Sequence, residues 1–235
     1  MDETGWREGR HRAWLWTAAT TGVTVFVVRR SRRATVAHEL LGERFWGSLV
    51  TDRWSAYTWY PPWRRQVCWA HLLRDIEAMI ARGGTSHTMG EALRAQAHQL
   101  CHWWHRVRDG TLAPPTVASY MWPVRQEVER WLDAGQTCGV PKTEGTCRAI
   151  LKRRQAWWTF VRHPEVEPTN NAAERAIRPG VRWRKGRFGP QSPVGSRVVE
   201  TMMTAVATLK QQHRNILDYV IAACEAALHN QPAPS

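Results

Sequence analysis

The alternation of apolar and polar residues near the start of the chain predicts β-strands. Residues 13–20 have the composition of a strand, and the apolar run 23–28 follows a Thr-Gly turn signal, so the two segments predict a hairpin. Two shorter apolar segments, residues 47–51 and 66–69, predict further strands. The first third of the chain is therefore expected to be rich in β-structure.

Helical spacing of the apolar residues appears within residues 35–45, where Gly42 is expected to end the helix early. A second helix is predicted over residues 70–82. Beyond it, helical patterns dominate and are separated by Pro-rich and Gly-rich breaks. These patterns cover residues 91–108, 117–132 and 145–161. They predict an all-helical segment that interrupts the β-rich part of the chain.

Residues 197–228 return to a helical pattern that carries an apolar stripe, for which core packing is the expected role. The stripe consists of Val198, Val199, Met202, Met203, Val206 and Leu209. The pattern as a whole predicts an α/β fold with a helical insertion.

The net charge of the chain indicates a binding partner, which the pattern of apolar residues does not. The chain has 33 Lys and Arg against 20 Asp and Glu, a net charge of +13, which favours a polyanion and nucleic acid first. A merely basic soluble protein is the alternative. The longest apolar run, residues 23–28, is far shorter than the roughly 20 residues of a membrane-spanning helix. The N-terminus lacks the features of a signal peptide, so we expect the protein to be retained inside the cell.

Three carboxylates stand in positions where they could serve phosphoryl chemistry. Asp52 directly follows an apolar strand, Glu174 lies near the start of a helix, and Asp2 is almost at the terminus. Each has a structural alternative: a turn-forming cap for Asp52, a capping box with Asn171 for Glu174, and a frayed charge for Asp2. Two Mg²⁺ ions on converging carboxylates can clamp a phosphodiester, but sequence spacing does not show convergence.

Six segments in order resemble the DDE-type transposases of the insertion sequence sixty-six family. They are "DETGW", "WLWTAAT", "LVTDRWSAY", "RQVCWAHLLRD", "TNNAAERAIRP" and "VRWRKGRFG...GSRV". The resemblance implies an RNase H-like mixed sheet flanked by helices and interrupted by an all-helical insertion. It divides the chain into a first part of the catalytic core (1–84), the insertion (85–160) and a second part of the core (161–230).

The same resemblance implies the active site and its chemistry. Asp2, Asp52 and Glu174 correspond to the catalytic triad, which would hold two Mg²⁺ (or Mn²⁺) ions for DNA cleavage and strand transfer. The segment "CWAH", with Cys68 and His71, resembles a signature found after the second acid of several transposase families.

Structural support near this site is expected from Cys68, His71, Asn170, Asn171 and Arg175. A zinc site is the alternative for the Cys/His pair, and it would add one of three further donors. These donors are Cys101, His102 and His105.

A basic segment lies between Arg175 and Arg197, and Pro179 is expected to end the preceding helix so that a Gly- and Arg-rich loop follows. We expect this loop to bind the backbone of double-stranded DNA without strong base preference, with a solvated basic loop as the alternative. The predicted DNA-binding residues are Arg178, Arg182, Arg184, Lys185, Arg187 and Arg197. The family resemblance further implies a homo-oligomer on DNA and a cytoplasmic, nucleoid-associated bacterial protein.

The family pattern includes a central first strand running through the first acid and a DNA-binding region before it. Only Met1 precedes Asp2, so we expect an N-terminally truncated chain, either because the gene is truncated or because its start is assigned too late. Two alternatives to an active transposase follow: an inactive remnant that binds DNA, and an RNase H-like nuclease that cleaves without joining.

Overall fold

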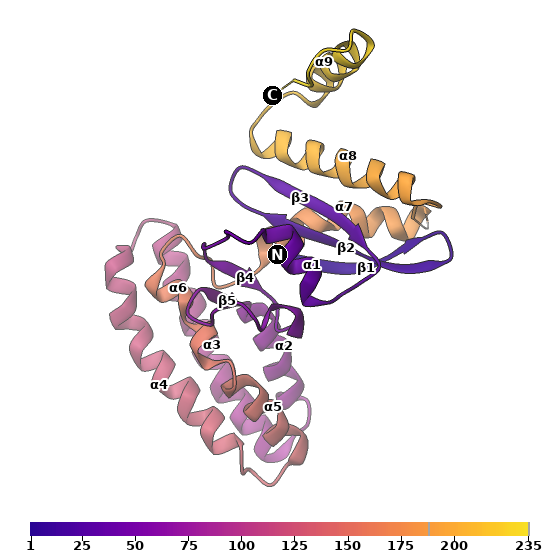
Figure 1. Cartoon of the computed structure of the whole chain (residues 1–235). Coiled ribbons are helices and arrows are strands. Elements are labelled where there is room, and N and C mark those ends of the chain that lie inside the picture. Colours follow the sequence, from indigo (N-terminus) through magenta and orange to yellow (C-terminus); the bar gives the residue numbers. More distant parts are fainter. Residues whose placement is uncertain (188, 235) are drawn as a thin grey trace. The chain divides into compact units, whose positions relative to one another are not determined.

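The chain forms a mixed α/β structure, which confirms the fold class at this level. The computed structural model describes residues 1–187 and 189–234. It divides into two compact units (Figure 1), of which unit 1 comprises Met1–Phe45 and Asn171–Ser235 and unit 2 comprises Trp46–Asn170. The division into 1–84, 85–160 and 161–230 remains a prediction. None of the described helices has both the length and the apolarity that crossing a membrane requires.

Unit 1 contains a three-stranded sheet and four helices in its described part. The strands are β1 (Asp2–Glu8), β2 (His11–Ala19) and β3 (Thr24–Arg29), and the helices are α1 (Ala34–Leu41), α7 (Asn171–Arg187), α8 (Pro193–Gln211) and α9 (Ile216–Leu228).

Unit 2 contains a two-stranded sheet and a set of helices. Its strands are β4 (Leu49–Thr51) and β5 (Arg65–Val67), and its α-helices are α2 (Trp69–Ile80), α3 (Gly84–Arg108), α4 (Val117–Gly135), α5 (Pro141–Leu151) and α6 (Thr159–Arg162). Short 3₁₀ turns are η1 (Ser55–Tyr57), η2 (Pro114–Thr116) and η3 (Arg154–Trp157).

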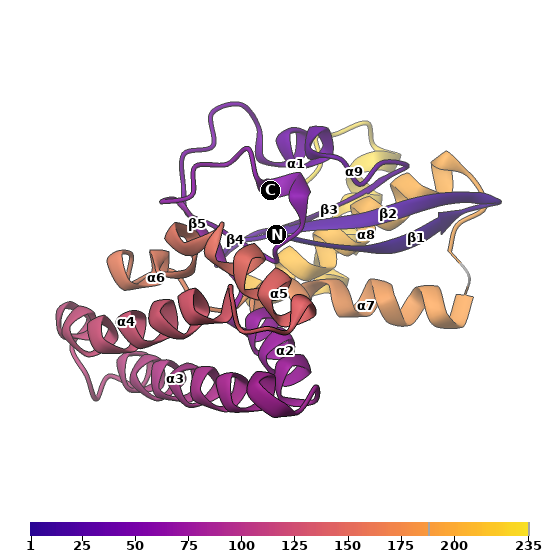
Figure 2. The same cartoon turned by 90° about the horizontal axis from the view of Figure 1, so that it is seen from below.

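The sheet of unit 1 is an antiparallel meander in the order β1-β2-β3, so the predicted hairpin is confirmed. Alternate residues of the strands face one side, as the twofold repeat of a strand requires. Leu15 and Phe26 are buried there with Ile177 of α7 and Val199 of α8. Figures 1 and 2 show α7 and α8 beside this sheet. The core of unit 1 therefore lies between one face of the sheet and this helix pair.

Side chains of α8 also cover the outer edge of β3. The backbone N–H groups of Thr24 and Phe26 donate to the hydroxyls of Thr208 and Thr204, at 3.2 and 3.0 Å. The N–H of Val28 donates to Glu200 Oε1 at 2.6 Å. Four helical residues rise about 6 Å and two strand residues span about 6.6 Å, so the two series stay in register. The edge of β3 is thus closed to another strand.

Helix α7 continues past Pro179 to Arg187, so the predicted helix end and basic loop are wrong. Proline removes one intrahelical hydrogen bond, but the ring here is exposed and the opposite side of the helix is packed. Ile177 and Gly180 are buried, and a Cβ at Gly180 would lie 2.4 Å from Leu15 Cδ2. Close packing of α7 on β2 therefore outweighs the local effect of the proline.

The predicted helix over residues 197–228 is divided between α8 and α9. His213 adopts a left-handed conformation with φ of 55°, and the Asn215 side chain caps α9 by accepting from the N–H of Leu217 at 2.9 Å. The apolar stripe is only partly core: Val199 is buried, whereas Val198 is 56% exposed. The stripe faces two environments because the sheet covers only one side of α8.

Unit 2 packs its helices into one apolar cluster beside the parallel pair β4–β5. The predicted helices over 91–108 and 117–132 are confirmed within the longer α3 and α4. The predicted helix over 145–161 is divided, because Trp157 and Trp158 turn into the core. Their rings lie edge-on to Trp69, with centroid distances of 5.6 and 5.1 Å.

Replacing Thr204 by valine tests the covered edge of β3. The change keeps the shape but removes the acceptor for the Phe26 N–H, so we expect the free energy of unfolding to fall by about 1–3 kcal/mol. Urea unfolding followed by circular dichroism measures it. The control is Thr201→Val on the exposed side of α8, with an expected change below about 0.5 kcal/mol. Equal stability of the two variants would contradict this role for Thr204.

Candidate active site

Asp2 is the first residue of β1, where it pairs in register with Thr17 of β2. Its Oδ1 accepts a hydrogen bond from the N–H of Glu3 at 3.0 Å. The Glu3 carboxylate is buried beside the Arg32 guanidinium, with a 2.8 Å ion pair. Asp2 thus belongs to a paired strand next to a buried ion pair, and the interpretation as a frayed terminal charge is not needed.

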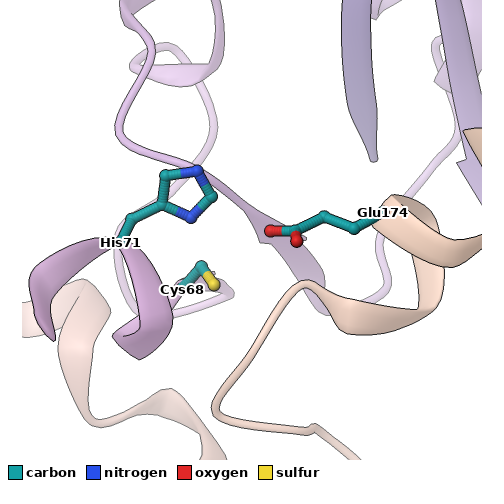
Figure 3. Close-up of side chains that lie close together, drawn as sticks. All are labelled: Cys68, His71 and Glu174. Carbon is teal, nitrogen blue, oxygen red and sulfur yellow. The ribbon is translucent and has the colours of Figure 1, made fainter. Parts of the chain in front are cut away.

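Glu174 lies in the first turn of α7 and is half-buried. The helix begins at Asn171, so Asn171 is its first residue rather than its N-cap, and Glu174 is the fourth helical residue, whereas a capping box needs the third. Figure 3 shows the Glu174 side chain extending from this first turn. A rigid, packed helix therefore carries this carboxylate.

Helix α7 runs along β1 in the same direction as the strand. The Arg184 guanidinium donates to the carbonyl of Gly5, and Gly189 lies against the backbone of Arg7. From Arg184 to Gly189 the chain therefore advances along β1 in the direction of the strand, from Gly5 to Arg7. Towards their N-termini, α7 and β1 therefore run to the same end of unit 1, where both elements begin. The first and third predicted acids lie at that end.

Asp52 belongs to unit 2, where it follows β4 as predicted. Its Oδ1 accepts from the N–H of Trp54 at 2.8 Å, which forms a side-chain turn. The next residue, Arg53, forms an ion pair with Asp75 of α2. Asp52 therefore forms the predicted turn. This hydrogen bond does not prevent the carboxylate from also binding a metal ion, and that role stays a prediction.

Arg65 holds the backbone at Asp52. Its guanidinium donates to the Asp52 carbonyl at 2.8 Å and to Thr51 Oγ1 at 3.0 Å. The side chain is buried in β5, and burial lowers the pKa of Arg65 to about 10. Its charge is retained at neutral pH despite this cost. The hydrogen bonds fix the chain direction as it leaves β4, and with it the position of Asp52.

Cys68 and His71 lie at the junction between β5 and α2 (Figure 3). Cys68 is fully buried, and its sulfur accepts from the N–H of Asn170 at 3.2 Å. The N–H of Trp69 donates to Pro168 at 2.9 Å. The junction therefore anchors the segment that leads into α7. These contacts agree with a supporting role for Cys68, which remains a prediction.

The zinc alternative finds no support among the described residues. No group of possible ligands within reach of one ion contains any of the three additional donors of that hypothesis. They are Cys101, His102 and His105, which are spread along α3.

The predicted DNA-binding residues lie mostly on helices. Arg178, Arg182 and Lys185 are exposed at helical spacing on one side of α7, and Arg187 ends this helix. Arg184 is half-buried against β1, so it also fixes α7 on the sheet. Arg197 and Arg175 are exposed, on α8 and α7 respectively.

The structural roles of Arg65 and Arg32 near the acids have no signal in the sequence. Arg65 directly precedes a short apolar segment, and Arg32 is one of several arginines after β3. Neither belongs to a periodic pattern. Their partners, the Asp52 carbonyl and the Glu3 carboxylate, lie 13 and 29 residues away in the sequence. Only the folded structure shows these pairs.

Comparisons with known proteins support the family resemblance. The sequence model of a family described as "Transposase IS66 family" matches residues 1–197. The "Uncharacterized protein y4qI" of Sinorhizobium fredii (strain NBRC 101917 / NGR234) is 27% identical over 252 residues, covering 94% of this chain and 45% of that protein. The chain thus spans less than half the length of this curated relative. No solved structure matches the chain.

The contact between Cys68 and Asn170 gives a stability prediction. Replacing Cys68 by alanine removes the acceptor for the buried Asn170 N–H and is expected to lower the free energy of unfolding by about 1–3 kcal/mol. Denaturant titration measures the change. The exposed Cys224 offers a matched control, for which Cys224→Ala should shift stability by less than about 0.5 kcal/mol. If both alanine variants unfold at the same denaturant concentration, the anchor is absent.

Proposed function

Because the chain belongs to the IS66 transposase family, we propose that it is the catalytic part of a DDE-type transposase that cleaves DNA and joins its strands. The match over residues 1–197 is the observation that carries the proposal, since it includes all three candidate acids. The placement of two of these acids at one end of unit 1 supports it.

The proposal includes an RNase H-like core with one mixed sheet. Unit 1 supplies antiparallel strands and unit 2 supplies a parallel pair, so both kinds of pairing that such a sheet combines are present. Side chains of α8 occupy the edge of β3, so a further strand could join the sheet of unit 1 only at β1. β1 would then be an interior strand with Asp2 at its start.

Asp2, Asp52 and Glu174 would hold two Mg²⁺ or Mn²⁺ ions. The donor set fits these ions, because hard cations prefer carboxylate oxygens, and each acid is carried by a strand, a strand end or a packed helix. When bound, such ions supply the activation of water and the charge neutralisation that phosphodiester cleavage requires. The chain itself positions the acids, and Arg65 orients Asp52 through its backbone.

The exposed cations of α7 would bind the DNA backbone. Arg178, Arg182 and Lys185 line one side of the helix over about 10 Å, a length comparable to a few phosphates along a strand. Phosphate contacts fix the position of the duplex without reading its sequence. The helix that carries Glu174 would thus also position the DNA beside it. We propose that the active species is a homo-oligomer on double-stranded DNA.

Two alternatives remain as competing proposals. An inactive remnant would bind DNA through the same cations but cleave nothing, and an RNase H-like nuclease would cleave without joining. Mg²⁺-dependent cleavage of an element-end duplex would distinguish an active enzyme from the inactive remnant. A strand-transfer assay with a pre-cut 3′-OH end separates the second.

Asp52→Asn is expected to abolish Mg²⁺-dependent cleavage and joining, because the substitution removes a charged ligand while keeping the turn acceptor for the Trp54 N–H. Gel assays of an element-end duplex measure both steps, and circular dichroism checks the fold. Asp133→Asn on the exposed surface of α4 is the matched control and should retain full activity. Undiminished cleavage by the Asp52 variant would exclude it from the active site.

Removing the three cations of α7 is expected to weaken duplex binding and its dependence on salt. In the triple alanine variant of Arg178, Arg182 and Lys185, the slope of log affinity against log salt should fall by about 0.9 for each phosphate that the protein no longer neutralises. Fluorescence anisotropy with a labelled duplex at several salt concentrations measures the slope.

A charge-matched control removes three arginines of unit 2 that pair with acids on their own helices. They are Arg125, Arg130 and Arg148. This control changes the net charge equally, so its slope should stay near that of the unmodified chain. The same decrease in both variants would show that overall charge, rather than α7, determines DNA binding.

A further inference from the structure

Helix α9 carries a large apolar face that its own unit leaves exposed. Leu217, Ile221 and Leu228 are 65%, 48% and 80% exposed, and Cys224 lies between them. Their spacing of four, three and four residues places them on one side of the helix. Among the described residues of α9, only Ala226 is buried. A contiguous apolar face of this kind is typical of a binding surface.

A groove of about 490 Å³ lies between α7 and α8 on the same unit. Its walls include Pro179 and Trp183 from α7 and Met202 and Val206 from α8. Trp183 and Met202 are 40% and 44% exposed, so the groove presents large apolar side chains to the surroundings. An apolar groove between two helices can receive the apolar face of an amphipathic helix, which presents residues three and four positions apart.

The two surfaces carry opposite charges. Between Ile216 and Leu228 the chain has Asp218 and Glu225 but neither Lys nor Arg, although the whole chain has a net charge of +13. Asp218 and Glu225 are seven residues apart and therefore flank the apolar face on one side. The groove is lined by Arg175 of α7 and Lys210 of α8. The acidic flank of α9 and the basic rim of the groove are thus complementary in charge.

The cations of the groove gather at one end of it. α7 runs with β1, and α8 runs against β3, since Thr208 lies at Thr24 and Glu200 lies at Val28. The outer strands of the meander are parallel to each other, so the two helices are antiparallel. The start of α7 therefore lies beside the end of α8, which places their basic residues together.

We propose that α9 of a second copy of this chain docks in the α7–α8 groove. Reciprocal docking places each α9 in the partner's groove and closes a twofold dimer with two identical contacts. The apolar face of α9 would meet the groove, and its acidic flank would meet the basic end. The proposed contact is separate from the catalytic proposal and lies on a surface of unit 1. It can be tested in the absence of DNA and metal.

Sedimentation of the full chain without DNA tests the dimer. We expect a concentration-dependent dimer, and the variant Ile221→Asp should raise its dissociation constant at least about tenfold, as for an apolar anchor. Trp122→Asp on α4 replaces another exposed apolar residue, 59% exposed, and should leave the constant unchanged. A chain that stays monomeric, or equal effects of the two variants, would overturn the proposal.

Cross-linking then identifies the occupant of the groove. Cys224 is exposed on the apolar face of α9, and the variant Met202→Cys adds a thiol in the groove. Mild oxidation should form a disulfide between residues 224 and 202 of two chains, visible as a covalent dimer and located by mass spectrometry. The same disulfide within a single chain would overturn docking between copies and assign the groove to the chain's own α9.

Discussion

The contact between α8 and the edge of β3 determines how unit 1 is built. Alternate backbone N–H groups of the strand donate to side chains that recur every fourth residue along the helix. This match between the two repeats fixes the height and direction of α8 with hydrogen bonds that would break if the helix slid along the strand. It also closes one edge of the sheet, so the arrangement of α7, the remaining edge at β1 and the groove between the helices all depend on it.

The same constraint connects the scaffold with the proposed chemistry. α7 lies on the sheet beside α8, and close contact at Gly180 and Arg184 sets its direction along β1. This direction brings Glu174 to the end of the unit where Asp2 begins its strand. In unit 2, Arg65 performs a comparable task for Asp52 by holding the backbone of the turn. Packing and hydrogen bonding far from any substrate thus prepare the acids that the proposed function needs.

Local pattern predicted most elements but not their ends or surroundings. The hairpin, α1 with its end at Gly42, and the long helices α3 and α4 follow from periodicity and turn residues. The helix end predicted at Pro179 is wrong, because the packing of Gly180 against Leu15 outweighs the hydrogen bond that the proline removes from α7. The acids followed from a family pattern, whereas Arg65 could not be found, because its role depends on partners that only folding brings near.

In the proposed active site, Asp2, Asp52 and Glu174 share divalent ions in a transposase core. Anomalous diffraction from crystals of the chain grown with Mn²⁺ tests it most directly. We expect manganese peaks within coordination distance of carboxylate oxygens from all three residues. Manganese bound elsewhere, with Asp52 and Glu174 coordinating no common ion, would contradict it.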